Sequence, residues 1–131
     1  MRSLAREIVF KFIFSRLFNP SDEGLFDVLC RDIDDSDKIF ATRLLNAVEN
    51  GQTQYLLDIE DLAIGYKLTR VYNSDKCALL IGMAELNAFP DTPIPVVIDE
   101  AVKLSAKYST ENSTDFVNGI LAEYARRKNN G

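Results

Sequence analysis

Two segments of this chain are apolar on nearly every side of a helix, and this feature limits what the chain can fold into. The first covers residues 3–18 and the second covers residues 74–88. A surface helix has one apolar stripe, whereas a helix that is apolar all round must be covered by other helices. We therefore expect an all-α protein in which each half of the chain is built around one central helix.

The other segments show a single apolar stripe at helical spacing. We predict about seven to eight helices, over residues 3–18, 21–30, 36–50, 52–64, 68–72, 75–88, 95–108 and 113–128. The predicted helix stops are Asn19-Pro20, Asn50-Gly51 and Gly65, since proline and glycine interrupt helices. The predicted helix-starting residues are Ser21 or Asp22, the Asp-rich stretch 32–37, Ser74-Asp75, Pro95 and Ser113. We expect a single domain over 1–131, with helical halves of about 1–65 and 66–131 that meet at Gly65.

Composition excludes several classes of chemistry. The chain has 131 residues, 15 basic and 20 acidic, a net charge of −5, and no histidine. Catalytic triads, Cys-His dyads and histidine-ligated zinc are therefore excluded. The negative charge argues against a protein that coats nucleic acid by overall charge, although a local basic patch is compatible with it.

The two cysteines and the lack of a long apolar run indicate a cytoplasmic protein. Cys30 and Cys77 lie far apart in apolar segments, so we expect reduced, buried thiols. No run approaches the roughly 20 apolar residues that cross a bilayer, and the N-terminus does not resemble a signal peptide.

Signals for catalysis are weak, so we expect no enzymatic activity, no cofactor and no metal. Asp99-Glu100 opens a helix, where acidic residues ordinarily stabilise the helix dipole. The acidic stretch 32–37 lacks the spacing and the glycine of a calcium loop. Asn118-Gly119 lies inside a strongly predicted helix. For Gly119 we favour close packing between helices. Asn118 either forms hydrogen bonds with the backbone of a loop or faces a ligand.

Four stretches resemble the NusB transcription antitermination family. Residues 93–109 read PIPVVIDEAVKLSAKYS and residues 116–121 read FVNGIL, similar to the paired C-terminal motifs of that family. Residues 5–7 (ARE) and 75–86 (DKCALLIGMAEL) match two further family motifs in order. The resemblance extends over nearly the whole chain.

The resemblance implies a fold and a function. The fold is two antiparallel three-helix bundles packed together. The function is non-enzymatic binding of boxA-type RNA together with the ribosomal protein NusE, in a complex with other Nus factors that acts on elongating RNA polymerase in ribosomal RNA operons. The resemblance leaves open whether the free protein forms a homodimer.

The resemblance also assigns residues to the RNA surface and to the partner. Its RNA-binding positions are Arg2, Arg6, Phe14, Asp75, Lys76, Asn112 and Asn118, and its nearest NusE-contacting position is Glu85. Basic residues would contact phosphate, Phe14 would stack on a base, and Asp75 would accept from a base amino group. The family arginine and tyrosine of the sixth predicted helix are replaced by Leu80 and Ala84, which weakens this part of the surface.

Two rival functions remain open. A helical protein–protein adaptor would explain Leu80, Ala84 and the short basic arm at the N-terminus. An RNA-tethering domain of the kind fused to ribosomal RNA methyltransferases shares the fold, but we expect a cofactor-binding domain beyond Gly131 in that case. Local charge favours RNA binding, because residues 1–18 carry four basic groups and one acidic group while residues 19–61 carry most of the acidity.

Overall fold

The computed structural model describes residues 2–20, 24–65 and 67–130, and this part of the chain is entirely helical. Its elements are α1 (Arg2–Phe18), α2 (Leu25–Leu29), α3 (Asp35–Leu62), the 3₁₀ turn η1 (Leu68–Arg70), α4 (Asn73–Ala88), α5 (Ile94–Tyr108) and α6 (Ser113–Asn130). The all-α prediction is confirmed, with six α-helices and one 3₁₀ turn over these residues.

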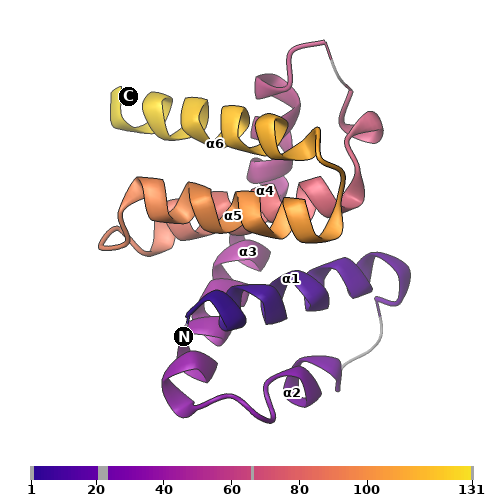
Figure 1. Cartoon of the computed structure of the whole chain (residues 1–131), viewed down its shortest axis with the longest axis vertical. Coiled ribbons are helices and arrows are strands. Elements are labelled where there is room, and N and C mark those ends of the chain that lie inside the picture. Colours follow the sequence, from indigo (N-terminus) through magenta and orange to yellow (C-terminus); the bar gives the residue numbers. More distant parts are fainter. Residues whose placement is uncertain (1, 21–23, 66, 131) are drawn as a thin grey trace.

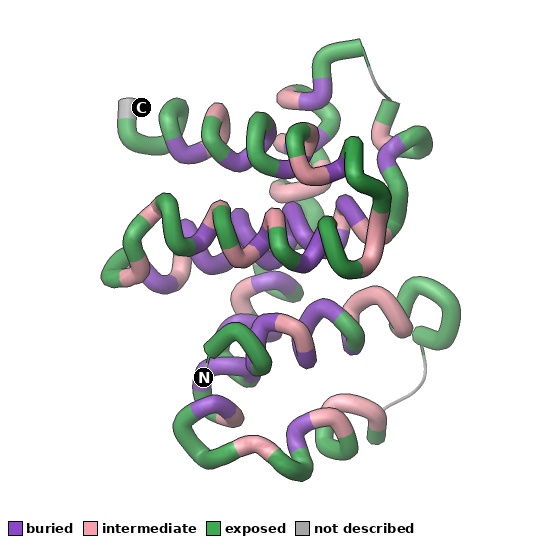
Figure 2. The backbone as a smooth tube through the Cα atoms, viewed as in Figure 1, coloured by how far each residue is buried: buried purple, intermediate pink, exposed green. Residues whose placement is uncertain are grey.

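Helix α4 lies at the centre of the molecule and contacts α1, α3, α5 and α6 (Figure 1). Every residue from Cys77 to Leu86 is buried, which is the outcome expected for a helix that is apolar all round. Helix α1 contacts α2, α3, α4 and α5. Buried residues concentrate where the helices face one another, and the outer faces of α5 and α6 are exposed (Figure 2).

The predicted break at Asn50-Gly51 is wrong, because α3 is one helix of 28 residues that passes through both positions. Its first part buries Phe40, Leu44 and Val48, and its second part buries Ile59. Packing against α1 and against α4 along this length offsets the roughly 1 kcal/mol that a glycine costs inside a helix. The chain turns only after Leu62, and Gly65 adopts a φ of 84°, a left-handed conformation that suits glycine.

The predicted helix starts have mixed outcomes. Asp34 caps α3 by accepting a hydrogen bond from the backbone N–H of Asp37 at 2.8 Å. Pro95 lies in the first turn of α5, as predicted. Ser74-Asp75 does not cap a helix, because α4 begins at Asn73 and its N-cap residue Tyr72 provides no side-chain hydrogen bond. The predicted cap at Ser21 or Asp22 lies outside the described residues.

Cys30 and Cys77 are both buried and unpaired. Burial raises the pKa of both thiols, that of Cys77 to about 12. In the described part of the chain, no helix combines the length and the apolar character that crossing a membrane requires.

Candidate nucleic-acid interface

A small pocket of about 150 Å³ opens between η1, the first turn of α4 and the first turn of α6. Asp75 lines it and is only 3% exposed. Its Oδ2 atom accepts a hydrogen bond from the Ser113 hydroxyl at 2.9 Å, whereas its Oδ1 atom has no hydrogen-bond partner among the described residues. An unpaired buried acceptor costs free energy, so this pocket favours a ligand that donates a hydrogen bond, such as a nucleobase amino group.

A cluster of hydroxyl groups fixes Asp75 in place. The Ser113 hydroxyl lies 2.9 Å from that of Ser109 and 3.0 Å from that of Thr110, and it also accepts from the Thr110 N–H at 3.4 Å. Ser113 opens α6, as expected, but its side chain ties the α5–α6 turn to α4. The carboxylate of Asp75 is therefore held at a defined position before any ligand arrives.

The rim of this Asp75 pocket carries a positive charge, an aromatic ring and an amide. Arg70, Tyr72 and Asn112 line it and are exposed, Tyr72 to 60%. The structure therefore brings Asp75 and Asn112 together, as the resemblance implies. Arg70 and Tyr72 are missed by sequence reasoning, which treats residues 68–72 only as a short turn of helix. A basic and an aromatic residue shortly before Asp75 were the available signal.

A row of aromatic rings follows one face of α1. Phe10 stacks on Tyr108 at 4.8 Å, Phe14 lies 6.1 Å from Phe10, and Phe18 lies 5.4 Å from Phe14. Exposure rises along the row, from 2% at Phe10 through a half-buried Phe14 to 70% at Phe18. Because Tyr108 ends α5 and Asn112 immediately precedes α6, the row begins one short turn from the Asp75 pocket.

Arg6 lies in the interior and is paired with Glu85. Its Nε and Nη2 atoms donate to the two carboxylate oxygens of Glu85 at 2.7 and 2.6 Å, and its Nη1 atom lies 3.4 Å from Glu100. Burial alone would lower the pKa of Arg6, but the hydrogen bond that Arg6 donates to Glu85 and the charges of Glu85 and Glu100 raise it. The side chains of Arg6 and Glu85 are 4% and 1% exposed, so neither is presented at the surface. Their direct contacts with RNA and NusE stay predictions that require this pair to open.

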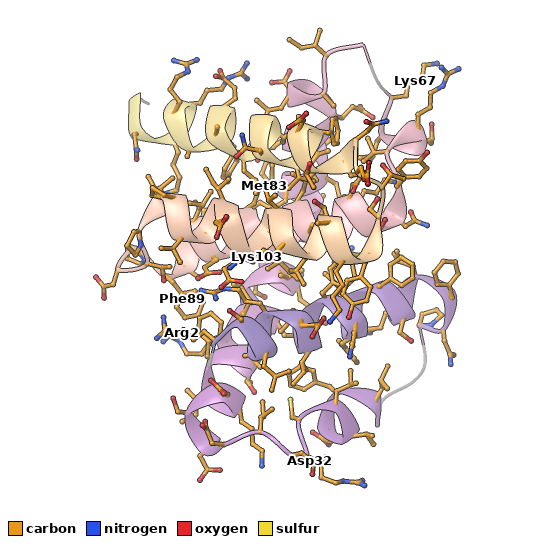
Figure 3. All side chains as sticks on the ribbon, in the orientation of Figure 1. Arg2, Asp32, Lys67, Met83, Phe89 and Lys103 are labelled. Atoms are coloured by element: carbon orange, nitrogen blue, oxygen red, sulfur yellow. The ribbon has the colours of Figure 1, made fainter. Side chains whose placement is uncertain are left out.

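Arg2 lies apart from the other predicted RNA-binding residues. Its guanidinium group packs over the Phe40 ring at 4.6 Å, and the side chain is exposed. Arg2 and Phe14 are roughly 18 Å apart along α1. Figure 3 shows Arg2 at the N-terminal end of α1, well separated from Lys67, which precedes η1. The predicted residues therefore form an extended surface instead of one compact site.

The last two predicted residues lie on further faces. Lys76 is half-buried beside Asp75 in the first turn of α4, and Asn118 is exposed on α6. The expectation of close helix packing at Gly119 is wrong, because a Cβ built there meets no atom within 4 Å and the residue is exposed. Over the described residues, no group of three or more histidine, cysteine, aspartate or glutamate side chains could hold a metal ion.

The fold and this surface define a class: an all-helical protein whose helix ends form a small pocket around a buried carboxylate. Comparison with known proteins then gives the family. The NusB family model matches residues 3–126, and the chain belongs to the NusB family.

Individual relatives agree with this assignment. The chain is 35% identical to the transcription antitermination protein NusB of Pseudothermotoga lettingae, over 95% of this chain and 91% of the relative. It is 28% identical to the NusB protein of Clostridium novyi, over 92% and 94% of the two chains. The solved structure of T. maritima NusB superimposes with a TM-score of 0.90 at 29% identity, over 96% of this chain and 91% of that one. A structure of the antitermination factors NusB and NusE in complex with dsRNA has the same fold, with a TM-score of 0.85 at 22% identity, over 96% of each chain.

Proposed function

We propose that this protein is a transcription antitermination factor that binds boxA-type RNA together with the ribosomal protein NusE. In this role it joins an RNA polymerase elongation complex with other Nus factors and suppresses termination in ribosomal RNA operons. Family membership supports the role, and so does the common fold with a NusB that was solved with NusE and RNA.

One observation supports RNA binding most strongly, namely the buried Asp75 oxygen that has no partner among the described residues. The amino groups of adenine, cytosine and guanine are donors, and in a single strand they are free to enter a pocket. Asn112 can donate or accept at the rim, and Tyr72 offers a ring for stacking. We therefore assign the Asp75 pocket to one unpaired base.

The strand is proposed to continue along the aromatic row. Phe14 and Phe18 extend from the α5–α6 turn toward the end of α1 and become more exposed with distance from the turn. Bases stack on such rings with little sequence preference. Sequence would then be read at the Asp75 pocket, and affinity would come from stacking and from basic side chains.

Arg2 and Arg6 are assigned different roles. Arg2 is exposed and has no carboxylate partner among the described residues, so it is the arginine that we propose contacts a phosphate. Arg6 acts through its ion pairs, which hold α1 against α4 and α5. Glu85 supports the partner surface from inside by fixing Arg6, while Lys76 and Asn118 stay proposed RNA contacts.

The remaining assignments follow from a binding role. The protein acts in the cytoplasm by binding and not by catalysis, and it needs no cofactor. We propose one domain over 1–131, because α3 crosses from α1 to α4 and α6 and so joins the two halves near Gly65.

Fluorescence anisotropy with labelled boxA RNA tests the proposal. We expect the mixture with NusE to bind boxA more tightly than a scrambled RNA of the same composition, with affinity that falls as salt rises. If boxA and scrambled RNA bind equally, the antitermination role is contradicted. If NusE binds and RNA does not, the adaptor function replaces the antitermination role. Sedimentation of the free protein shows whether it forms a homodimer.

The contact at Arg2 can be tested in the same assay. Replacing Arg2 with Ala should weaken boxA binding and reduce the salt slope by roughly 1, because one phosphate contact is lost. Arg31→Ala is the matched control, since Arg31 is also exposed but lies between α2 and α3, away from the Phe40 ring on which Arg2 packs. An unchanged slope for Arg2→Ala would remove this residue from the interface.

A further inference from the structure

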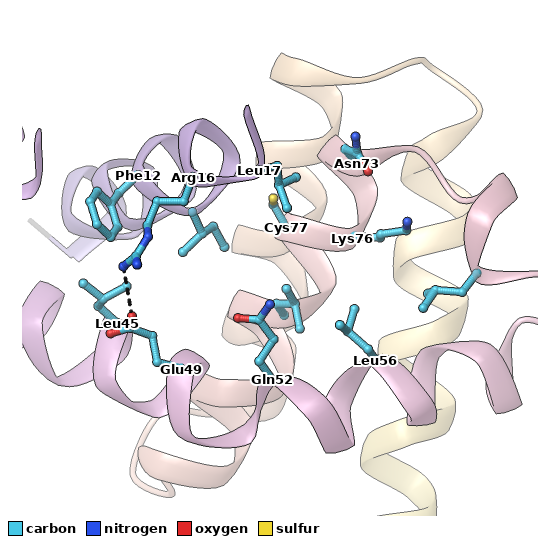
Figure 4. Close-up of a pocket in the computed structure, with 13 residues that line it drawn as sticks. Phe12, Arg16, Leu17, Leu45, Glu49, Gln52, Leu56, Asn73, Lys76 and Cys77 are labelled. Atoms are coloured by element: carbon cyan, nitrogen blue, oxygen red, sulfur yellow. Dashed lines mark hydrogen bonds and ion pairs between the residues drawn. The ribbon is translucent and has the colours of Figure 1, made fainter. Parts of the chain in front are cut away.

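A second and larger cavity, of about 430 Å³, lies between α1, α3 and α4 (Figure 4). Its floor is apolar and includes Phe12, Leu56 and Leu80. Its polar lining residues are Arg16, Glu49, Gln52, Asn73 and Lys76. The volume is in the range of pockets that enclose small ligands, and an apolar floor with a few polar groups is their usual composition.

The polar groups at this cavity suit a planar ligand with hydrogen-bonding edges, such as a nucleobase. Arg16 bonds Glu49 at 3.2 Å and spans the cavity from α1 to α3, while Lys76 has no carboxylate partner in the described part of the chain (Figure 4). Gln52 and Asn73 each offer an amide, which can both donate to and accept from a base edge. The guanidinium group of Arg16 packs over the Phe12 ring at 5.3 Å, and its other face can stack on a base in the way that arginine does in single-stranded RNA recognition.

The first turn of α4 separates this cavity from the Asp75 pocket. Asn73 lines the larger cavity and Asp75 lines the smaller one. In η1, Leu68 lines the larger cavity and Arg70 lines the smaller one. The N-cap residue Tyr72 gives no side-chain hydrogen bond to this turn. The first N–H groups of a helix have no intrahelical acceptor, so a phosphate placed between the two pockets would find donors there.

We propose that the larger cavity binds a second unpaired nucleobase of the same RNA strand, and that the start of α4 binds the phosphate that joins the two bases. This inference rests on the proposed RNA binding and extends it to a two-nucleotide site. Two independent features support it: the buried, unpartnered Asp75 oxygen in the adjoining pocket, and an amphipathic cavity of suitable size directly across the helix start.

Methyl NMR on leucine-labelled full-length protein tests whether a base enters the cavity. The probe is a single-stranded boxA RNA added with NusE, and the reporters are Leu56, Leu68 and Leu80. A stacked base should shift these methyl resonances upfield by its ring current. The exposed Leu57, on the same helix as Leu56 but outside the cavity, should be unaffected.

Variants test the polar contacts. Gln52→Ala combined with Asn73→Ala should weaken boxA binding about tenfold and remove the effect of an abasic substitution at one RNA position. Gln54→Ala is the matched control, because Gln54 lies on α3 and bonds Asp58 outside the cavity. Asp75→Asn should instead remove the loss of affinity caused by an abasic substitution at the neighbouring nucleotide of the RNA.

The outcomes separate this inference from the proposed function. If RNA binds normally and the cavity methyl groups do not shift, the second base site is overturned and the function stands. If no boxA binding occurs, both are overturned. Methyl shifts with NusE alone would assign the cavity to a protein side chain, and equal shifts with uridine monophosphate would assign it to a free nucleotide; either result overturns the strand assignment.

Discussion

The buried pair of Arg6 and Glu85 shows how a residue can keep a family motif without lying at the surface. From sequence alone, Arg6 is expected to contact phosphate, because the sequence does not show that its side chain is buried and paired. In the structure its donors are used by Glu85 and Glu100, which are carried by α4 and α5. The ion pairs of Arg6 therefore hold α1 against α4 and α5.

Removing Glu85 should be strongly destabilising. Glu85→Ala leaves the Arg6 charge in an interior where it is only 4% exposed, and we expect a loss of about 3–5 kcal/mol in the free energy of unfolding. Glu49→Ala removes an exposed pair with Arg16 and should cost at most about 1 kcal/mol. Urea unfolding measures both; equal costs would show that the buried pair does not hold the core.

Glu7 should make stability depend on pH. Hydrogen bonds from Lys107 and Tyr108, both at 2.6 Å, hold the pKa of Glu7 below its ordinary value of 4.5. A lowered folded-state pKa gives stability that is present above pH 4.5 and lost as pH falls through the folded value.

Glu7→Gln should therefore be less stable than the parent at pH 7, and the difference should shrink as pH falls below 4.5. Urea unfolding between pH 7 and pH 3 measures it. Asp99→Asn, which removes an exposed pair with Lys103, should show little difference at any pH. A Glu7→Gln deficit that is constant with pH would contradict the assigned charge interaction.

At the scale of the helices, two glycines inside α4 and α6 have opposite surroundings. A Cβ at Gly82 would lie 2.6 Å from Cδ1 of Leu121, a leucine that is fully buried. A Cβ at Gly119 would meet nothing within 4 Å. Close packing therefore requires glycine at position 82 in α4. At position 119 in α6, glycine only weakens the helix.

Alanine substitutions should separate the two positions. Gly119→Ala should raise the free energy of unfolding by about 0.5–1 kcal/mol, because alanine favours the helix and fits the space. Gly82→Ala should lower it by about 1–3 kcal/mol through overpacking. Thermal or urea unfolding tests both. Destabilisation by Gly119→Ala would show that α6 needs glycine there for a reason absent from the packing.

The helices could be predicted where the apolar periodicity of the sequence determines their bounds. They could not be predicted where tertiary packing determines those bounds. Helices α1 and α4 follow directly from their all-round apolar character, and Pro95 marks the start of α5. The continuity of α3 through Asn50-Gly51 was not predictable, because it depends on contacts with helices distant in the sequence. For the same reason, local sequence gives no means to identify Gly82 as the closely packed glycine.

At the scale of the whole molecule, the candidate site is assembled from ends of separate elements. Asp75 and Ser113 are 38 positions apart and meet only because α6 packs on α4. The family resemblance identifies Asp75 and Asn112. It does not reveal that Oδ1 of Asp75 lacks a hydrogen-bond partner among the described residues, or that Arg70 and Tyr72 lie at the rim. Those come from the way η1, α4 and α6 converge.

The same assembly explains how a chain of net charge −5 can present an RNA surface. The proposed RNA surface uses one negative group, the Asp75 carboxylate, which accepts a hydrogen bond from Ser113 and is proposed to accept another from a base. Exposed Arg70 supplies positive charge at the rim of this pocket, and exposed Arg2 supplies it at a distance, at the N-terminal end of α1. Binding should therefore depend on particular contacts more than on overall charge.

Binding of boxA RNA by Asp75→Asn in the presence of NusE tests this account most directly. Asparagine preserves the shape and can still accept from Ser113, but it removes the charged acceptor, so affinity should fall about tenfold even though a negative charge is lost. Asp115→Asn makes the same charge change on an exposed residue of α6 and should bind as well as the parent or slightly better. Equal or tighter binding by Asp75→Asn would contradict the account.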